Sequence, residues 1–380
     1  MPGKISISFP HMGDYSAVFT QVLRHMFPQA RVFPAPPMTQ RTVELGGRHS
    51  PDFVCSPFKF NLGNYIEALE EGANVLFQTG LGCRYGYYGE LQEQILRDLG
   101  YQFRFVCLSR DRANPQYVYQ TFRELGCPLS TPKMIEAGLL ALASIRVMDR
   151  YDYFMRENAG FETVPGSFEG VRRQLLREIE AADGFGDLLE AGTRSRRAAA
   201  GIRLDRPENP LRVGIVGDLY TLMEPFSNFY VERQLAKDGI AVSRKMSVWF
   251  LMFGQNHRRA VKKSGRYLHH TVGANGVDSV AQSLSYARQG YDGIIHMKSF
   301  GCIPELNATP ALLNLSRHWG IPILDLSFDS HTSETGVQTR LEAFSDMIRM
   351  KKEEEDAAKR EPGRGRGFGV HQGRRAGQQR

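Results

Sequence analysis

The segment that decides the fold is residues 80–89, GLGCRYGYYG, which follows the apolar run of residues 74–78, NVLFQ. This pattern predicts a β-strand that ends in a glycine-rich loop, with a helix following over about residues 90–99. The glycines approximate the G-x-G-x-x-G spacing that closes a backbone around a pyrophosphate at a helix N-terminus. The same loop carries Cys83, whose thiolate could hold a metal instead. One loop therefore supports two functional interpretations.

Short apolar segments alternate with helical patterns of ten or more residues on both sides of this loop. The expected strands are residues 4–9, 30–33, 52–55, 74–78, 102–108, 211–217, 240–244, 293–298 and 321–328. Such alternation is typical of βαβ units, in which parallel strands are joined by helices. The sequence therefore predicts an α/β protein with two parallel-sheet halves.

Residues 116–206 interrupt the alternation with long helical patterns over about residues 133–157 and 168–189. We therefore expect an N-terminal α/β domain (1–115), a helical segment (116–206) and a C-terminal α/β domain (207–352).

The C-terminal end of the chain carries most of the net charge. Residues 359–380 contain seven basic residues and one acidic residue, so they hold 7 − 1 = +6 of the chain's net charge of +7. Their glycine- and arginine-rich composition predicts a disordered basic tail, which we place at residues 353–380. Because residues 1–358 are then nearly neutral, the folded part implies no specific nucleic-acid partner.

The N-terminal residues lack the apolar region of a signal peptide, and no apolar run approaches the ~18 residues of a membrane span. These features predict a soluble, cytoplasmic protein with no membrane partner. Five cysteines in such a chain indicate metal-binding, redox or buried thiols, because disulfide frameworks belong to exported proteins.

Three of the cysteines, Cys55, Cys83 and Cys302, directly follow expected strands. Ligands of open α/β sheets gather beyond the carboxyl ends of the strands, so these thiols could meet between the two halves. Three thiolates suit an iron–sulfur cluster with one iron left open, but the absence of a C-x-x-C pair leaves inert thiols as the alternative. Cys107 and Cys127 lie in a strand and at a helix end, where we expect buried structural thiols.

A nicotinamide- or flavin-binding loop at residues 80–86 is the rival hypothesis. A strand precedes this loop, a helix follows it, and Asp111 lies about 25 residues further on, as such sites require. Cys83, Arg84 and Tyr85 are bulky for a loop that admits a pyrophosphate, which argues against this interpretation.

Several polar side chains also follow expected strands and are candidates for catalysis or for tuning a bound cofactor. Such groups either line the site or stabilise loops and helix N-termini. They are His11, Tyr15, Lys59, Glu224, Asp329, His331 and Glu334.

Five segments together resemble one known family. They are residues 9–16, 53–59, 80–90, 301–305 and 328–336. In combination they look like the superfamily of 2-hydroxyacyl-CoA dehydratase components and double-cubane cluster proteins, and most like its branch of CoA-substrate-specific activase-related proteins. The resemblance implies two flavodoxin-like (Rossmann-like) domains with a helical part between them. By motif it also implies an oxygen-sensitive cluster, [4Fe-4S] or bridged double cubane, whose iron is held by Cys55, Cys83 and Cys302.

The resemblance further implies a separate ATP-hydrolysing activase of the actin and sugar-kinase superfamily, because this chain has no P-loop of its own. It also implies a homodimer, or a heterodimer with a related subunit. The expected function is to accept low-potential electrons from the activase for reduction or radical dehydration of a small molecule or an acyl-CoA. A non-catalytic electron carrier or scaffold for the activase is the alternative, since the flanking motifs differ from those of the well-studied two-subunit dehydratases.

Overall fold

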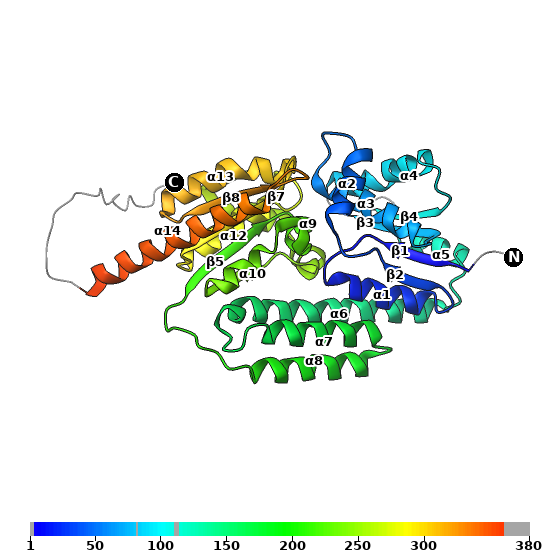
Figure 1. The fold of residues 1–380 in the computed structure, drawn as a ribbon, viewed down its shortest axis with the longest axis horizontal. Helices are drawn as coiled ribbons and strands as arrows, with labels where there is room; N and C mark the ends of the chain where they lie inside the picture. Colours follow the sequence, from blue (N-terminus) through cyan, green and yellow to red (C-terminus); the bar gives the residue numbers. More distant parts are fainter. Residues whose placement is uncertain (1–3, 81–82, 110–113, 361–380) are drawn as a thin grey trace.

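The protein contains two four-stranded, all-parallel sheets, as the sequence predicts (Figure 1). The computed structural model describes residues 4–80, 83–109 and 114–360. The first sheet has the order β2-β1-β3-β4 and the second the order β6-β5-β7-β8. This order begins like that of flavodoxin-like domains. The strands are β1 Ser6–Phe9, β2 Arg31–Pro34, β3 Val75–Gly80, β4 Arg104–Ser109, β5 Leu211–Gly217, β6 Ile240–Arg244, β7 Gly293–Ser299 and β8 Ile323–Phe328.

Helices cover both faces of the first sheet, so apolar side chains on both sides of its central strands are buried. In β3, Val75 and Phe77 pack with residues of α1 and α5, whereas Leu76 faces the opposite side and packs with α3 and α4. The helical elements of this domain are α1 Tyr15–Met26, α2 Gln40–His49, α3 Ser56–Glu70, η1 Arg84–Tyr87, α4 Tyr88–Asp98 and α5 Pro115–Glu124.

The strand expected at residues 52–55 does not form. These residues make the turn between α2 and α3, where the side chain of Phe53 is 93% exposed. The two helices pack closely because Gly46 and Gly63 lie at their contact; a Cβ atom there would approach Lys59 O and Thr42 O to 1.7 and 2.0 Å. Cys55 therefore lies at the start of a helix rather than at the end of a strand.

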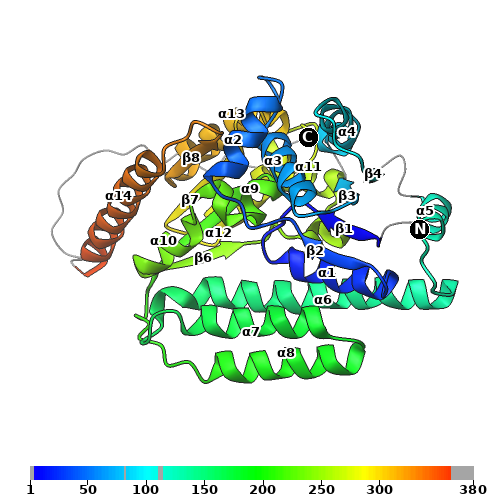
Figure 2. The same ribbon diagram turned by 45° about the vertical axis from the view of Figure 1, so that its right-hand side comes forward.

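The helical segment consists of α6 Thr131–Asn158, α7 Ser167–Ala181 and α8 Phe185–Ala200, with the short η2 Ala159–Phe161. The single helical pattern expected at residues 168–189 is thus two helices, separated by residues 182–184. Figure 2 shows the three long helices stacked against the two sheet domains. Because α6 contacts α1 of the first domain and β6 of the second, this segment joins them.

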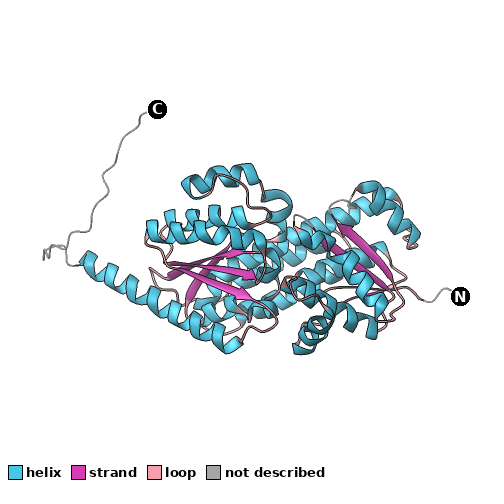
Figure 3. Cartoon of the chain, turned by 90° about the horizontal axis from the view of Figure 1, so that it is seen from above, coloured by secondary structure: helices cyan, strands magenta, loops and turns pink. Residues whose placement is uncertain are grey.

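In the second domain, the helices again lie on both faces of the sheet (Figure 3). One face packs with α10 and α14, and the other with α12 and α13. The elements are α9 Leu219–Met223, η3 Pro225–Asn228, α10 Val231–Lys237, η4 Phe250–Gly254, α11 His257–Ser264, η5 Gly265–Tyr267, α12 Gly276–Arg288, α13 Ile303–Trp319 and α14 Glu334–Arg360.

Helix α14 extends further than the sequence suggested. Residues 353–360, expected to belong to the disordered tail, are helical. Their sequence, EEEDAAKR, consists mainly of good helix formers, and Lys351 forms an i,i+4 ion pair with Glu355 at 3.7 Å. The rest of the predicted tail, residues 361–380, lies outside the described residues. No helix within the described part has both the length and the apolar character that a membrane crossing requires.

Candidate functional site

Cys55, Cys83 and Cys302 each occupy the residue immediately before a helix. Cys55 precedes α3, Cys83 precedes η1, and Cys302 precedes α13. Helix N-termini present free backbone N–H groups and favour negative charge, so all three positions suit a thiolate or an anionic cofactor. We call these three thiols the cysteine site.

The neighbours of these cysteines contact one another across the two domains. Ser56 N donates a hydrogen bond to Ser299 Oγ at 2.8 Å, and Ser56 Oγ donates to Phe328 O at 2.7 Å. The Arg84 guanidinium donates to Gly301 O at 2.7 Å. These bonds join the segments that carry Cys55 and Cys83 to the segment that carries Cys302. The segments that carry the three cysteines therefore meet at the boundary between the domains.

The Cys55 thiol is buried against a tyrosine hydroxyl. Its Sγ lies 2.7 Å from Tyr88 Oη. Burial raises the pKa of Cys55 to about 11, although the hydrogen bond from Tyr88 and the charge of Arg84 lower it. Burial also raises the pKa of Tyr88, so this hydroxyl keeps its proton and can donate to a thiolate.

Cys83 is held by the loop that follows β3. Its Sγ accepts a hydrogen bond from Tyr85 N at 3.4 Å. Desolvation raises the pKa of Cys83, and the Tyr85 amide opposes that rise. The Tyr85 hydroxyl in turn accepts a hydrogen bond from Asn61 Nδ2 at 2.7 Å, which ties the loop to α3.

The position of the Tyr85 ring explains why residue 80, at the start of this loop, is a glycine. A Cβ atom at Gly80 would lie 2.6 Å from the Tyr85 ring, which occupies the space beside the backbone. The dinucleotide hypothesis assigns that space to a pyrophosphate. The chain also places one residue more between Gly82 and Gly86 than the G-x-G-x-x-G spacing allows, and Gly82 lies outside the described residues.

Cys302 lies close to two acidic side chains. Burial raises its pKa strongly, and the charges of Asp218 and Glu305 raise it further. Asp218 is itself buried at the end of β5, where it accepts hydrogen bonds from Thr221 N at 2.9 Å and Ser299 N at 2.7 Å. Its charge also raises the pKa of Cys55 and Cys83, after the larger effect of desolvation. The charge of Asp218 therefore raises the pKa of all three thiols.

Two of the candidate polar residues meet across the domain boundary. His11 Nδ1 lies 2.7 Å from Glu224 Oε2, and the same carboxylate oxygen accepts a hydrogen bond from Gly13 N at 2.9 Å. The Glu224 side chain is 3% exposed and that of His11 is 19% exposed. The loop after β1 is thereby fastened to the segment after β5.

The other polar candidates lie in different surroundings. Tyr15 donates a hydrogen bond to Asp149 of α6 at 2.6 Å, so it joins a domain to the helical segment. Lys59 lies half-buried in the first turn of α3. His331 and Glu334 are exposed at or before the start of α14, where Asp329 Oδ1 accepts a hydrogen bond from His331 N at 2.8 Å. Asp329 thus stabilises a loop.

Cys107 and Cys127 are buried, 4% and 3% exposed, as the sequence predicts. Sequence reasoning did not select Asp218, Ser299 or Tyr88 for the site. Asp218 directly follows β5 and Ser299 ends β7, so the rule that selected the cysteines could have found both. Tyr88 is the first residue of α4 and belongs to the glycine-rich segment of residues 80–89, but nothing in that pattern distinguishes it from the neighbouring tyrosines.

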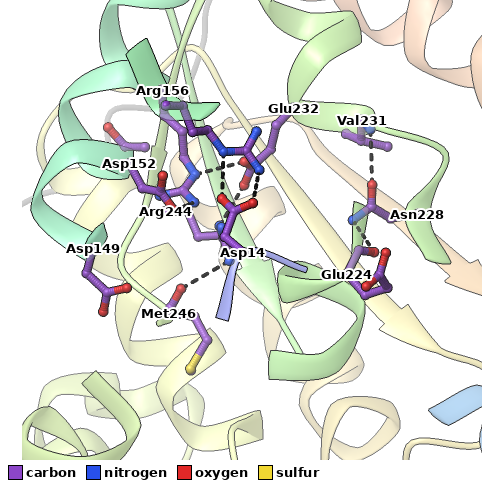
Figure 4. A network of polar contacts seen from close by, with 12 residues as sticks. Asp14, Asp149, Asp152, Arg156, Glu224, Asn228, Val231, Glu232, Arg244 and Met246 are labelled. Atoms are coloured by element: carbon purple, nitrogen blue, oxygen red, sulfur yellow. Dashed lines mark hydrogen bonds and ion pairs between the residues drawn. The ribbon is translucent and has the colours of Figure 1, made fainter. Parts of the chain in front are cut away.

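A buried network of charges holds the helical segment against both domains (Figure 4). Arg156 of α6 lies 3.2 Å from Asp152 and 2.8 Å from Glu232 of α10, and Glu232 also pairs with Arg244 of β6 at 2.6 Å. On the other side, Arg172 of α7 pairs with Asp14 of the first domain at 2.5 Å. These contacts fix the geometry on which the cysteine site depends.

Within the described ranges, no group of three or more His, Cys, Asp or Glu side chains could hold a metal ion. A single tetrahedral ion with bonds of about 2.3 Å needs its sulfur ligands about 3.8 Å apart. A cluster of several irons spreads its thiolates more widely. Three thiols form a donor set of the kind that iron–sulfur clusters use.

Among known proteins, no family model matches the chain and no curated protein matches it significantly.

Proposed function

We propose that this protein is an iron–sulfur protein whose cluster is held by Cys55, Cys83 and Cys302. The observation that carries the proposal is the convergence of the segments that carry three cysteines, each preceding a helix, where two parallel-sheet domains meet. A bound cluster would supply low-potential, one-electron chemistry. As the sequence resemblance implies, the protein would accept electrons in the cytoplasm from an ATP-hydrolysing activase and pass them to a small molecule or an acyl-CoA.

The side chains around the cysteines have defined roles in this proposal. The helix N-termini and the Arg84 guanidinium offset the negative charge of thiolates. The Tyr88 hydroxyl would donate a hydrogen bond to a Cys55 thiolate, and the Tyr85 N–H donates one to the sulfur of Cys83. Asp218 holds the amide of Ser299, which positions the segment before Cys302. Hydrogen bonds of this kind orient ligands and tune their electronic properties.

The direct test is anaerobic purification followed by reconstitution with iron and sulfide. We expect a brown protein that contains iron and acid-labile sulfide and loses its visible absorbance in air. A colourless, iron-free protein after reconstitution would refute the proposal. Adding the activase, ATP and a candidate substrate to the reconstituted protein then separates an enzyme from an electron carrier, because only an enzyme turns the substrate over.

Cluster assembly is expected to strengthen as the pH rises. The thiols bind iron as thiolates, and burial raises the pKa of Cys55 to about 11 and that of Cys302 even further. All three are therefore protonated in the metal-free protein near neutral pH, and binding must release these protons. Apparent affinity should rise by up to about tenfold per pH unit for each thiol. Iron retention against a calibrated chelator at pH 6.5, 7.5 and 8.5 measures this effect; equal retention at all three values would contradict it.

The Tyr88→Phe variant is expected to keep its cluster but to shift its reduction potential. Removing the hydroxyl deletes a hydrogen bond to the Cys55 sulfur, and such a bond stabilises the more negative, reduced state. A loss of about 1 kcal/mol corresponds to a potential about 40 mV more negative. A potentiometric titration followed by EPR measures the shift. The control is Tyr153→Phe, the same change at an exposed side chain of α6; equal shifts in both variants would argue against the assigned role.

A further inference from the structure

An apolar cavity of about 100 Å³ lies in the first domain, at the carboxyl edge of its sheet. Its walls come from the ends of β1, β3 and β4 and from α1 and α5. They include Phe9, Phe19, Val22, Phe77, Tyr85 and Leu108. Nothing in the proposed electron chemistry uses this cavity, although it opens at the edge where ligands of parallel sheets gather.

Two polar side chains of the wall, Gln78 and Tyr85, are already hydrogen-bonded within the protein. Gln78 Nε2 donates to Tyr85 O at 3.3 Å, and Gln78 Oε1 accepts from Tyr65 Oη at 3.3 Å. The Tyr85 hydroxyl accepts from Asn61. An occupant therefore contacts mainly hydrocarbon, and the cavity selects an apolar group.

The size of the cavity limits the occupant. A site for one water molecule needs only about 10–15 Å³, and a dry apolar cavity of about 150 Å³ binds benzene. By proportion, about 100 Å³ accommodates roughly four carbon atoms. An empty apolar cavity of this size destabilises a fold, and a larger side chain at Val22 would fill it. A single substitution could therefore fill the cavity and stabilise the fold. We expect such a cavity to be kept open where a ligand binds in it.

The cavity and the cysteine site share one wall. The Tyr85 ring lines the cavity, while the Tyr85 amide donates its hydrogen bond to Cys83 Sγ. A group bound in the cavity therefore lies directly behind the residue that holds Cys83.

We propose that this cavity binds a small apolar molecule, or the hydrocarbon end of a larger substrate, next to the cysteine site. The binding itself is independent of any cluster, whereas its role as a substrate pocket rests on the proposed function. A failure of one is therefore distinguishable from a failure of the other.

The test uses the full-length protein before and after reconstitution, with two probes. Xenon binding, measured by ¹²⁹Xe NMR, represents a free apolar molecule. Binding of 1-pentanol, measured as a rise in the thermal midpoint of unfolding, represents an alkyl end that carries a polar head. We expect saturable xenon binding in the wild type and its loss in Val22→Phe. Binding of 1-pentanol in addition supports the alkyl end of a larger substrate, and xenon binding alone supports a free small molecule.

The matched control is Val118→Phe, the same change at a partly buried valine of α5 outside the cavity wall, which should bind both probes like the wild type. If Val22→Phe does not fold, Val22→Ile adds one methylene group and should weaken xenon binding about fourfold. Absence of xenon binding in the wild type, or equal binding in the Val22 and Val118 variants, would overturn the proposal whatever the iron content.

Discussion

The Cys83→Ser variant is expected to lose the iron–sulfur cluster almost completely. Cys83 precedes η1 with its Sγ bonded to Tyr85 N, and a serine hydroxyl is a far poorer ligand for iron than a thiolate. With two cysteines left, the cluster would lack a third protein ligand. Iron, acid-labile sulfide and visible absorbance after anaerobic reconstitution measure the loss. Each should fall by roughly 80% or more from its wild-type value. Cys55→Ser and Cys302→Ser should behave alike.

The matched control is Cys107→Ser. Cys107 is the same residue type in the same domain, but it is buried in β4 and lies outside the cysteine site. This variant should keep its iron and its colour, with at most a modest loss of stability. Equal iron content in Cys83→Ser and in the wild type would remove Cys83 from the ligand set. Equal loss in Cys107→Ser would point to unfolding rather than to ligation.

The Arg156→Met variant is expected to lose about 3 kcal/mol of the free energy of unfolding. Arg156 lies between Asp152 and Glu232, and its side chain is 10% exposed. Methionine fills a similar volume but leaves Asp152 without its ion-pair partner and Glu232 with Arg244 alone, and an uncompensated buried charge is strongly destabilising. Urea unfolding followed by circular dichroism at pH 8 measures the change.

The pH dependence of this loss has a defined sign. Burial raises the pKa of Asp152 to about 6, despite the lowering effect of Arg156. Below that pH the carboxyl is neutral and needs no positive partner, so the loss in Arg156→Met should be smaller at pH 5 than at pH 8. A loss that grows as the pH falls would contradict this assignment.

The control for the buried network is Arg194→Met. Arg194 also has two carboxylate partners, Glu178 at 2.8 Å and Glu190, but its side chain is 55% exposed. Solvent screens such pairs, so this variant should lose much less stability than Arg156→Met. Equal losses in the two variants would mean that the ion pairs of Arg156 do not anchor the helical segment.

Local patterns in the sequence were sufficient to predict the two parallel sheets and the helical segment between them. Apolar runs such as residues 74–78 alternate with helical patterns, and this periodicity is a property of neighbouring residues. The same reasoning placed Cys83 and Cys302 after strands and buried Cys107, as the structure has them. The strand expected at residues 52–55 was wrong because four residues carry too little periodicity to separate a strand from a turn between helices.

Tertiary structure alone decided which side chains meet. His11 and Glu224 are 213 residues apart, and Ser56 and Ser299 are 243 residues apart. Such pairs form because the two sheets are held together by α6 and its buried ion pairs, and no local pattern encodes that arrangement. The sequence by itself determined most of the strands and helices and three candidate thiols. Only the packing of the domains brought the segments that carry those thiols together, because burial and proximity arise when distant parts of the chain meet.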